Sequence, residues 1–208
     1  VGIKGTGMAA LAELLTARGA VLSGSDVPEV FYTDEILSKL GITPRSPFNA
    51  SNLEQSVQLV IHSSAYKVDQ NPELVEATKR KIPVILYTEA LGELSSLSYS
   101  CGIAGVHGKT TTTGIAGTIL KGIDLNASAL AGSIISGFGN RCTMINGDKY
   151  FIAETCEYQR HFMDFHPQKI LLTSIESDHQ DCFPTYESIL SAFMQYIDLL
   201  PQFGELIY

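Results

Sequence analysis

Short apolar runs alternate with helix-forming segments along the whole chain, and this alternation predicts an α/β fold with mainly parallel sheets. Two glycine-rich turns support the prediction, because each lies between an apolar run and the start of a helical segment. The first turn contains Gly5 and Gly7, and the second runs from Gly105 to Thr110. The serine-rich stretch 95–98 reads as a linker. We therefore expect two domains, residues 1–97 and residues 98–208.

The composition is that of a folded protein, with 45% hydrophobic and 17% charged residues among 208. A net charge of −8 argues against a broad nucleic-acid-binding surface. No apolar run approaches the ~20 residues that a membrane-spanning helix needs. The cysteines form no C-x-x-C pair, so we expect reduced thiols in a cytoplasmic protein. They are Cys101, Cys142, Cys156 and Cys182.

The first turn fits the dinucleotide-binding pattern G-x-G-x-x-[GA] through Gly5, Gly7 and Ala10. Asp26 follows nineteen residues beyond Gly7, where such folds place the acid that binds a ribose hydroxyl. These features favour a nucleotide-type ligand. The alternative is a tight turn whose glycines only allow close packing. The elements expected around this turn are strands at 1–3, 20–23, 59–62 and 83–87 and helices at 8–18, 34–40, 71–81 and 88–97, the last capped by Thr88.

The second turn reads G-x-x-G-K-T and partly matches a phosphate-binding P-loop, although Ile103 stands where the first glycine of the usual motif belongs. Glycines let backbone N–H groups face a phosphate, and the helix N-terminus adds positive potential. Lys109 supplies a charge for the β- and γ-phosphates, and Thr110 supplies a hydroxyl for Mg²⁺. The alternative is a glycine-rich turn that caps a threonine-rich helix. The residues expected to contact ATP are Gly105, Val106, His107, Gly108, Lys109, Thr110 and Thr111.

Two more strands of the second domain are expected to end in groups suited to phosphate chemistry. Glu154 ends one strand, and Asp178 and His179 follow the next. Ligands of open α/β sheets bind beyond the carboxyl ends of strands, which would bring these groups to Lys109 and Thr110. Thr110 and Glu154 offer the oxygen ligands that Mg²⁺ prefers, and His179 is the candidate for a second ion, Mg²⁺ or Mn²⁺. A helix-capping or solvated strand-end acid is the alternative for Glu154.

The remaining elements of the second domain follow the same alternation. We expect strands at 100–104, 150–154 and 169–175, helices at 112 to about 122 and at 186–200, and glycine-rich turns at 129–133 and 137–140.

Six motifs follow one another along the chain. They are Gly5-x-Gly7-Met8, Ser23-Gly24-Ser25-Asp26, His62-Ser63-Ser64-Ala65, Ala104-Gly105-x-His107-Gly108-Lys109-Thr110-Thr111-Thr112, Ala153-Glu154-x-x-Glu157 and Ile175-Glu176-x-Asp178-His179-x-Asp181. Their order is more specific than any single motif. Together they resemble the Mur ligases of peptidoglycan synthesis, over essentially the whole chain.

The resemblance implies a Rossmann-like UDP-sugar-binding domain followed by the front part of a central P-loop ATPase domain, with a third domain outside this chain. It implies ATP-dependent joining of L-alanine to UDP-N-acetylmuramate through an acyl phosphate. Lys109, Glu154 and His179 would be catalytic, with Thr110 and Glu154 on one Mg²⁺ and His179 on a second. The UDP-sugar site would be lined by Gly5, Thr6, Gly7, Met8, Asp26, Ser63 and Ser64.

Several residues depart from the family pattern and leave the substrate contacts open. Lys4, Val106 and Tyr87 stand where a glycine, a threonine and an arginine are common. The role of Glu157 depends on whether a helix starts beside it. The nearest alternative function is the ligase that joins UDP-N-acetylmuramate to a ready-made tripeptide. An NAD-binding redox domain and a nucleotide-binding sensor without turnover are further alternatives, and the oligomeric state is left open.

Overall fold

The computed structural model describes residues 1–208, which divide into two compact units, Val1–Ala90 and Leu91–Tyr208. The division falls inside helix α4 (Tyr87–Ser96), a few residues before the boundary expected at 97/98. No helix is both long enough and apolar enough to cross a membrane.

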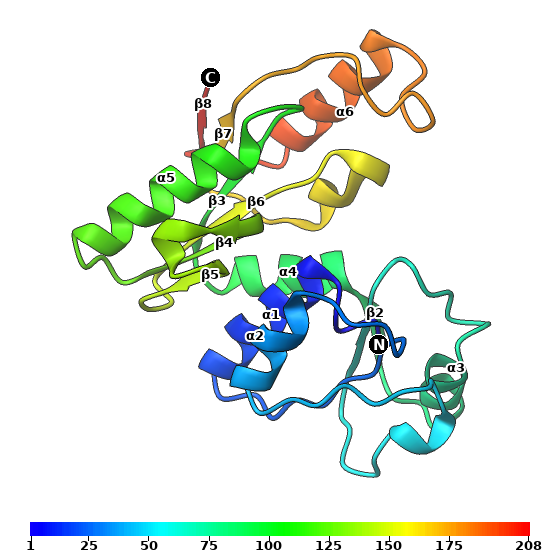
Figure 1. The fold of residues 1–208 in the computed structure, drawn as a ribbon. Coiled ribbons are helices and arrows are strands. Elements are labelled where there is room, and N and C mark those ends of the chain that lie inside the picture. Colours follow the sequence, from blue (N-terminus) through cyan, green and yellow to red (C-terminus); the bar gives the residue numbers. More distant parts are fainter. The chain divides into compact units, whose positions relative to one another are not determined.

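The first unit consists mainly of helices and loops around a small parallel sheet (Figure 1). Its strands β1 (Val60–His62) and β2 (Val84–Leu86) pair in parallel register, with Ile61 opposite Ile85. The helical segments are α1 (Thr6–Ala17), α2 (Thr33–Lys39), the 3-10 turn η1 (Ala50–Asn52), α3 (Pro72–Lys79) and the first residues of α4. The helices and the strands at 59–62 and 83–87 are thus confirmed to within a few residues.

Two expected strands of this unit do not form. Residues 1–3 hydrogen-bond to their neighbours at isolated points: Gly2 N and Ile3 N both donate to Ser25 O. Gly2 has a φ of 80°, a left-handed conformation that interrupts a ladder. The segment 20–23 is also irregular, with Val21 99% exposed, and only Ser25 beyond it forms an isolated bridge, to Arg45.

The Thr88 cap is also not formed. Helix α4 begins one residue earlier, at Tyr87, and the Thr88 hydroxyl is buried without a hydrogen-bond partner. Glu89 performs the capping role instead, because its carboxylate accepts a hydrogen bond from Leu86 N at 2.6 Å.

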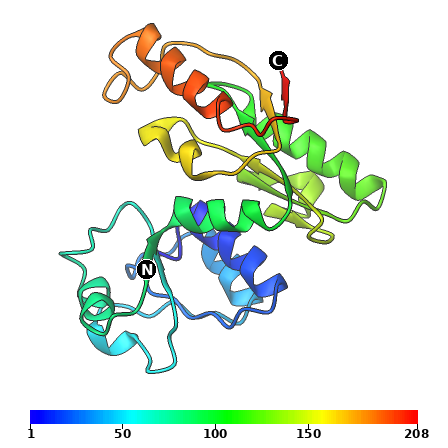
Figure 2. The same cartoon turned by 180° about the vertical axis from the view of Figure 1, so that it is seen from behind.

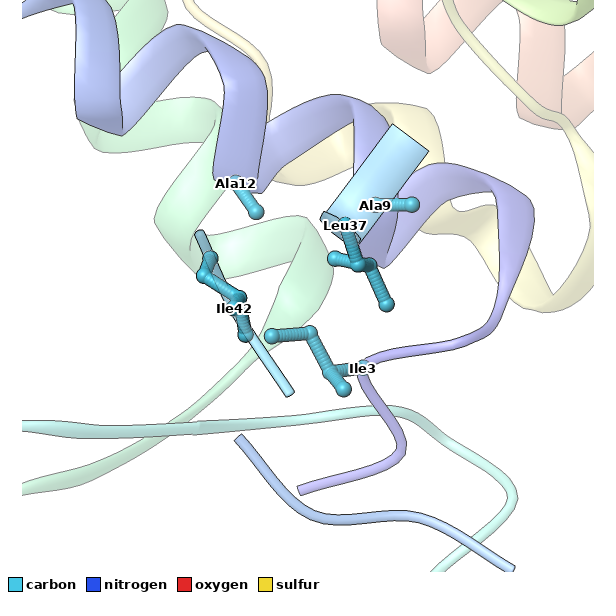
Figure 3. Close-up of a cluster of buried hydrophobic side chains, with 5 residues drawn as sticks. All are labelled: Ile3, Ala9, Ala12, Leu37 and Ile42. Carbon is cyan, nitrogen blue, oxygen red and sulfur yellow. The ribbon is translucent and has the colours of Figure 1, made fainter. Parts of the chain in front are cut away.

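A small apolar cluster joins the start of the chain to α1 and α2 (Figure 3). The alanines of α1 leave room for the larger side chains of the neighbouring segments. Its members are Ile3, Ala9, Ala12, Leu37 and Ile42. Because this cluster holds residues 1–3 against α1, it fixes the glycine turn between them.

The second unit is built on a six-stranded sheet of order β5-β4-β6-β3-β7-β8, in which only β5 is antiparallel to its neighbour. The strands are β3 (Tyr99–Ala104), β4 (Ala127–Ile135), β5 (Arg141–Ile145), β6 (Tyr150–Glu154), β7 (Lys169–Leu172) and β8 (Glu205–Ile207). Three neighbouring parallel strands, β6, β3 and β7, end at the same edge of the sheet. This edge is where ligands of such sheets bind.

Helices cover both faces of this sheet. Helix α5 (Lys109–Gly122) lies along one face, and the 3-10 segment η3 (Tyr158–Asp164) and helix α6 (Tyr186–Ile197) lie on the other (Figures 1 and 2). This arrangement follows from right-handed crossovers, because β3 to β4 and β6 to β7 run in opposite directions across the sheet. Helix α6 starts with a capping box between Thr185 and Ser188.

The glycine-rich turn expected at 129–133 is wrong, because these residues lie inside β4. Small residues are needed there, since a Cβ on Gly132 would come within 2.9 Å of the Glu154 carboxylate. The turn at 137–140 is confirmed: the 3-10 turn η2 (Ser136–Phe138) is followed by Gly139 and Asn140, both with positive φ. Strands β5 and β8 have no counterpart among the predicted elements.

Candidate functional site

The glycine loop of the second unit connects the carboxyl end of β3 to the N-terminus of α5. Gly105 has a φ of 134°, and a Cβ there would come within 2.1 Å of the Thr173 hydroxyl and 2.8 Å of Ser174 N. Gly108, the N-cap of α5, has a φ of 84°. Both positions therefore require glycine for reasons of conformation, and at Gly105 for space as well.

The loop backbone is tied to the segment after β7. Val106 N donates to Ser174 O at 3.0 Å, and His107 N donates to the Ser174 hydroxyl at 3.1 Å. The side chain of His107 is exposed and faces Glu176 at 3.9 Å. Thr111 lies on the first turn of α5 and is exposed. It is the last of the expected ATP-contacting residues along the chain.

Lys109 lies at the first position of α5, and its ammonium group reaches back over the loop. It donates to Gly105 O, to Val106 O at 3.3 Å and to the Glu157 carboxylate at 2.8 Å. Glu157 is buried, with its side chain 2% exposed. The sequence did not assign Glu157 a role, and the signal that could have found it is its spacing after Glu154 at a strand end.

Thr110 and Glu154 meet across the strand end, as the motif predicts. The Thr110 hydroxyl donates to Glu154 Oε2 at 2.8 Å, and Gly132 N donates to the same oxygen at 2.7 Å. A hydroxyl and a half-buried carboxylate beside a phosphate-binding loop are the hard oxygen donors that Mg²⁺ takes when phosphates and water supply the rest. The residues present therefore fit one Mg²⁺ ion held by this pair.

His179 lies beside Glu157. Its Nε2 is 3.4 Å from Glu157 Oε1, its backbone N donates to Asp178 at 2.7 Å, and its ring contacts that of Tyr158 with centroids 5.0 Å apart. The structure thus brings His179 to the same strand-end cluster as Lys109, and Glu157 is the group that joins them. Its expected role as ligand of a second ion stays a prediction.

Cys156 stands next to Glu157 in the chain and is exposed as a residue. Local desolvation raises the pKa of its thiol, and the negative charge of Glu157 acts in the same direction.

In the first unit, the glycine turn leads into α1, whose first turn contains no acidic side chain. Gly5 has a φ of −58°, and a Cβ there would meet only Gly2 O, at an ordinary contact distance of 3.6 Å. At Gly7 a Cβ would lie 2.8 Å from the Tyr87 ring and hydroxyl. Thr6 bonds to the hydroxyl of Tyr32, and Met8 is buried. Close packing against Tyr87 is therefore one reason why position 7 is a glycine. This agrees with the alternative in which the glycines of this turn allow close packing.

Asp26, the expected ribose-binding acid, is 4% exposed and bonded within the chain. Its carboxylate accepts hydrogen bonds from Lys4 N at 2.6 Å, Val27 N at 2.8 Å and the Tyr66 hydroxyl at 3.1 Å. The buried carboxylate orders the glycine turn through Lys4 N. Burial, reinforced by Asp26, raises the pKa of Tyr66 to about 12.

Ser63 and Ser64 follow β1 next to the start of the chain. Ser63 N donates to Val1 O at 3.0 Å, and a Cβ on Gly2 would lie 2.9 Å from Ser63 Cβ. Ser64 is exposed. The segments that contain Gly5, Asp26 and Ser63 therefore gather around residues 1–4, whereas direct contact of these residues with a UDP-sugar stays a prediction.

Comparisons with known proteins agree with this geometry. A sequence profile described as Mur ligase family, catalytic domain, matches residues 1–99. The chain is 60% identical over all 208 residues to a UDP-N-acetylmuramate–L-alanine ligase of Treponema pallidum, and it covers 43% of that protein. It therefore spans less than half the length of this curated relative.

Two solved structures share the fold. A UDP-N-acetylmuramate:L-alanyl-gamma-D-glutamyl-meso-diaminopimelate ligase from Neisseria meningitides matches with a TM-score of 0.86 and 25% identity, over 99% of this chain and 68% of that one. A UDP-N-acetylmuramate–alanine ligase from Thermotoga maritima matches with a TM-score of 0.80 and 26% identity, over 96% of this chain and 46% of that one.

The glycine loop lies beyond the residues matched by the family profile, but the identity to the Treponema pallidum ligase extends through it. The α/β fold with its mainly parallel six-stranded sheet agrees with both solved structures. The order of the six motifs, the strand-end cluster and the sequence identity along the whole chain show that the chain belongs to the Mur ligase family.

Proposed function

We propose that this chain forms the nucleotide-binding part of an ATP-dependent ligase that joins L-alanine to UDP-N-acetylmuramate. The first unit is the Rossmann-like UDP-sugar-binding domain, and the second is the front part of the P-loop ATPase domain. The observation that carries the proposal is the pairing of Lys109 with Glu157 and of Thr110 with Glu154 at one sheet edge, in a chain 60% identical to such a ligase.

The reaction needs an activated carboxylate, because a carboxylate oxygen is a poor leaving group. A muramoyl carboxylate oxygen attacks the γ-phosphorus of ATP, the bond to the bridging oxygen breaks, and ADP leaves. The amine of L-alanine then attacks the acyl carbon, inorganic phosphate leaves, and the amine loses a proton. Phosphoryl transfer of this kind depends on positioning and on stabilising charge, not on covalent chemistry by the protein.

The residues of this chain supply that positioning. The glycine loop and the N-terminus of α5 receive the phosphates, and Lys109 places its ammonium charge over the loop, where negative charge develops on the transferred group. Thr110 and Glu154 would hold Mg²⁺, which, when bound, neutralises phosphate charge. His179 lies in the segment that follows β7, 3.4 Å from Glu157, and in this proposal it faces the same transferred phosphoryl group as Lys109.

In the first unit, Gly5, Thr6 and Gly7 present the N-terminus of α1 to the pyrophosphate of the UDP-sugar. Asp26 acts mainly by ordering this turn, since its oxygens already accept three hydrogen bonds from the chain. ATP and a nucleotide sugar are cytoplasmic metabolites, and the four cysteines are free, so we place the reaction in the cytoplasm.

A second candidate is the ligase that uses a ready-made tripeptide as the amine. The TM-score of 0.86 to the Neisseria ligase, whose name specifies a tripeptide, favours it. The 60% identity to an L-alanine ligase outweighs that likeness, because the solved structure is only 25% identical.

The test is phosphate release by the full-length gene product with ATP, Mg²⁺ and UDP-N-acetylmuramate, given L-alanine or the tripeptide. Release that requires L-alanine is the expected result. Release with the tripeptide alone would favour the second candidate. Binding of both nucleotides without release with either amine would indicate a sensor, and binding of NAD alone would indicate a redox domain.

A further inference from the structure

We propose that Glu157 is a positioning residue, whose buried carboxylate holds the Lys109 ammonium with one oxygen and the His179 imidazole with the other. The inference rests on the proposed function, in which Lys109 and His179 face the same transferred phosphoryl group. Neither the sequence motifs nor the comparisons assign Glu157 this role.

The carboxylate of Glu157 is shared between Lys109 and His179. Glu157 Oε2 is 2.8 Å from Lys109 Nζ, and Glu157 Oε1 is 3.4 Å from His179 Nε2. The three residues come from the ends of three neighbouring strands, β6, β3 and β7. A carboxylate that is 2% exposed needs such partners, because an unpaired buried charge is strongly unfavourable.

The backbone on both sides of this contact is strained. Gln159 and Arg160, just after Glu157, have φ values of 51° and 60°, and His179 has a φ of 50°. Non-glycine residues in this region are uncommon and cluster at functional sites. Hydrogen bonds hold them there: Arg160 N donates to Glu157 O at 2.8 Å, and Cys182 N and Phe183 N both donate to His179 O at 2.8 Å.

The hydrogen bonds of Lys109 indicate which of its N–H donors a nucleotide phosphate would take. An ammonium group has three N–H donors, and all three have partners: Gly105 O, Val106 O and Glu157. The contact to Val106 O is the weakest, at 3.3 Å. A phosphate oxygen takes that donor, while Glu157 keeps the ammonium group over the loop.

Glu157→Gln tests this role with little change of shape. In the structure Lys109 and His179 contact different oxygens of Glu157; an amide puts an NH₂ group, which only donates, at one of these two positions, so one of the two contacts loses its acceptor. We expect the dissociation constant for a non-hydrolysable ATP analogue with Mg²⁺ to rise at least tenfold by calorimetry. Glu157→Asp keeps the charge at a shorter reach and should give an intermediate value.

A spectroscopic readout separates positioning from a general structural effect. In ¹H–¹⁵N spectra of the histidine rings, Glu157→Gln should shift the Nε2 signal of His179 and leave that of His161 in place. Glu187→Gln, an exposed acid in the first turn of α6, is the matched control and should change neither readout.

The two possible failures can be told apart. If the unaltered chain does not bind the ATP analogue, the proposed function is wrong at its first step. If the unaltered chain binds it and Glu157→Gln binds equally well with the His179 signal unchanged, the positioning role is wrong. Should Glu157→Gln fail to fold, Glu157→Asp carries the same comparison.

Discussion

The two glycine turns of this protein use glycine for different purposes. In the first unit, Gly7 makes room for the Tyr87 ring, and Gly5 adopts a conformation open to any residue. In the second unit, Gly105 and Gly108 adopt backbone conformations that other residues rarely take. The comparable tyrosine contact lies within β3 itself, where a Cβ on Gly102 would meet the Tyr196 hydroxyl at 2.0 Å. The loop of the second unit therefore needs glycine for backbone conformation, and at Gly105 also for space against Thr173.

The side chains around the two turns differ in the same way. Around the first turn the buried carboxylate of Asp26 is bonded to backbone N–H groups and a tyrosine. Around the second loop, two carboxylates bond to Lys109 and Thr110, the groups that a nucleotide would need. On the proposed function, we expect ATP affinity to depend on single charged side chains and affinity for the UDP-sugar to be spread over backbone and packing contacts.

The largest effect is expected for Lys109→Ala. ATP affinity should fall at least about 100-fold, corresponding to about 3 kcal/mol of charge-assisted hydrogen bonding. The affinity for UDP-N-acetylmuramate should stay within about twofold, as expected for separate sites. Calorimetry measures both, with Lys121→Ala, an exposed lysine near the end of α5, as the control. Equal loss of both affinities would contradict the hypothesis of two separate nucleotide sites.

Gly105→Ala and Gly5→Ala sharpen the comparison of the turns. At Gly105 the new Cβ meets Thr173 and the backbone of Ser174, and the φ of 134° adds strain, so we expect a loss of about 3 kcal/mol in the free energy of unfolding. At Gly5 the loss should be below about 1 kcal/mol, the cost of a poorer N-cap. Urea denaturation followed by circular dichroism gives both values. Similar losses would mean that the two turns do not differ as described.

Tyr196→Phe tests the tyrosine contact of the second unit. The Tyr196 hydroxyl is buried beside Thr155 but makes no hydrogen bond of ordinary geometry, and burial raises its pKa. Removing an unsatisfied buried hydroxyl should stabilise the protein by about 1 kcal/mol. Thermal unfolding of the variant beside Tyr99→Phe, an exposed tyrosine on β3, measures this. Destabilisation by a similar amount would show that the hydroxyl has a partner.

The smallest effect concerns Tyr66 and pH. Its pKa is raised to about 12, above the value of about 10 in an unfolded chain, so the neutral form favours the folded state. That contribution is complete below about pH 10 and is lost between about pH 10 and 12. The stability difference between the unaltered chain and Tyr66→Phe should therefore shrink across this range. Denaturation curves in steps from pH 8 to 11 measure this, and a constant difference would contradict the raised pKa of Tyr66.

In the second unit, local patterns predicted the three strands that carry the site, β3, β6 and β7, and helices α5 and α6, but not β4, β5 or β8. The motif around Lys109 specified the loop, and the pairing of Thr110 with Glu154 followed from parallel strands that end at one edge. In the first unit the apolar run 20–23 reads as a strand, yet Val21 is exposed and no neighbour completes a ladder. The spacing of Glu157 after Glu154 marks it in the sequence, but its contacts with Lys109 and His179 depend on how the segments after β6 and β7 fold, which no sequence period reports.

The central claim is that each unit carries its own nucleotide site, and the most direct test is calorimetric titration of this chain with UDP-N-acetylmuramate. We predict saturable binding with one site per chain, unchanged in Lys109→Ala, and no heat of binding with NAD. Binding of NAD in place of the UDP-sugar, or loss of UDP-sugar binding in Lys109→Ala, would contradict the account.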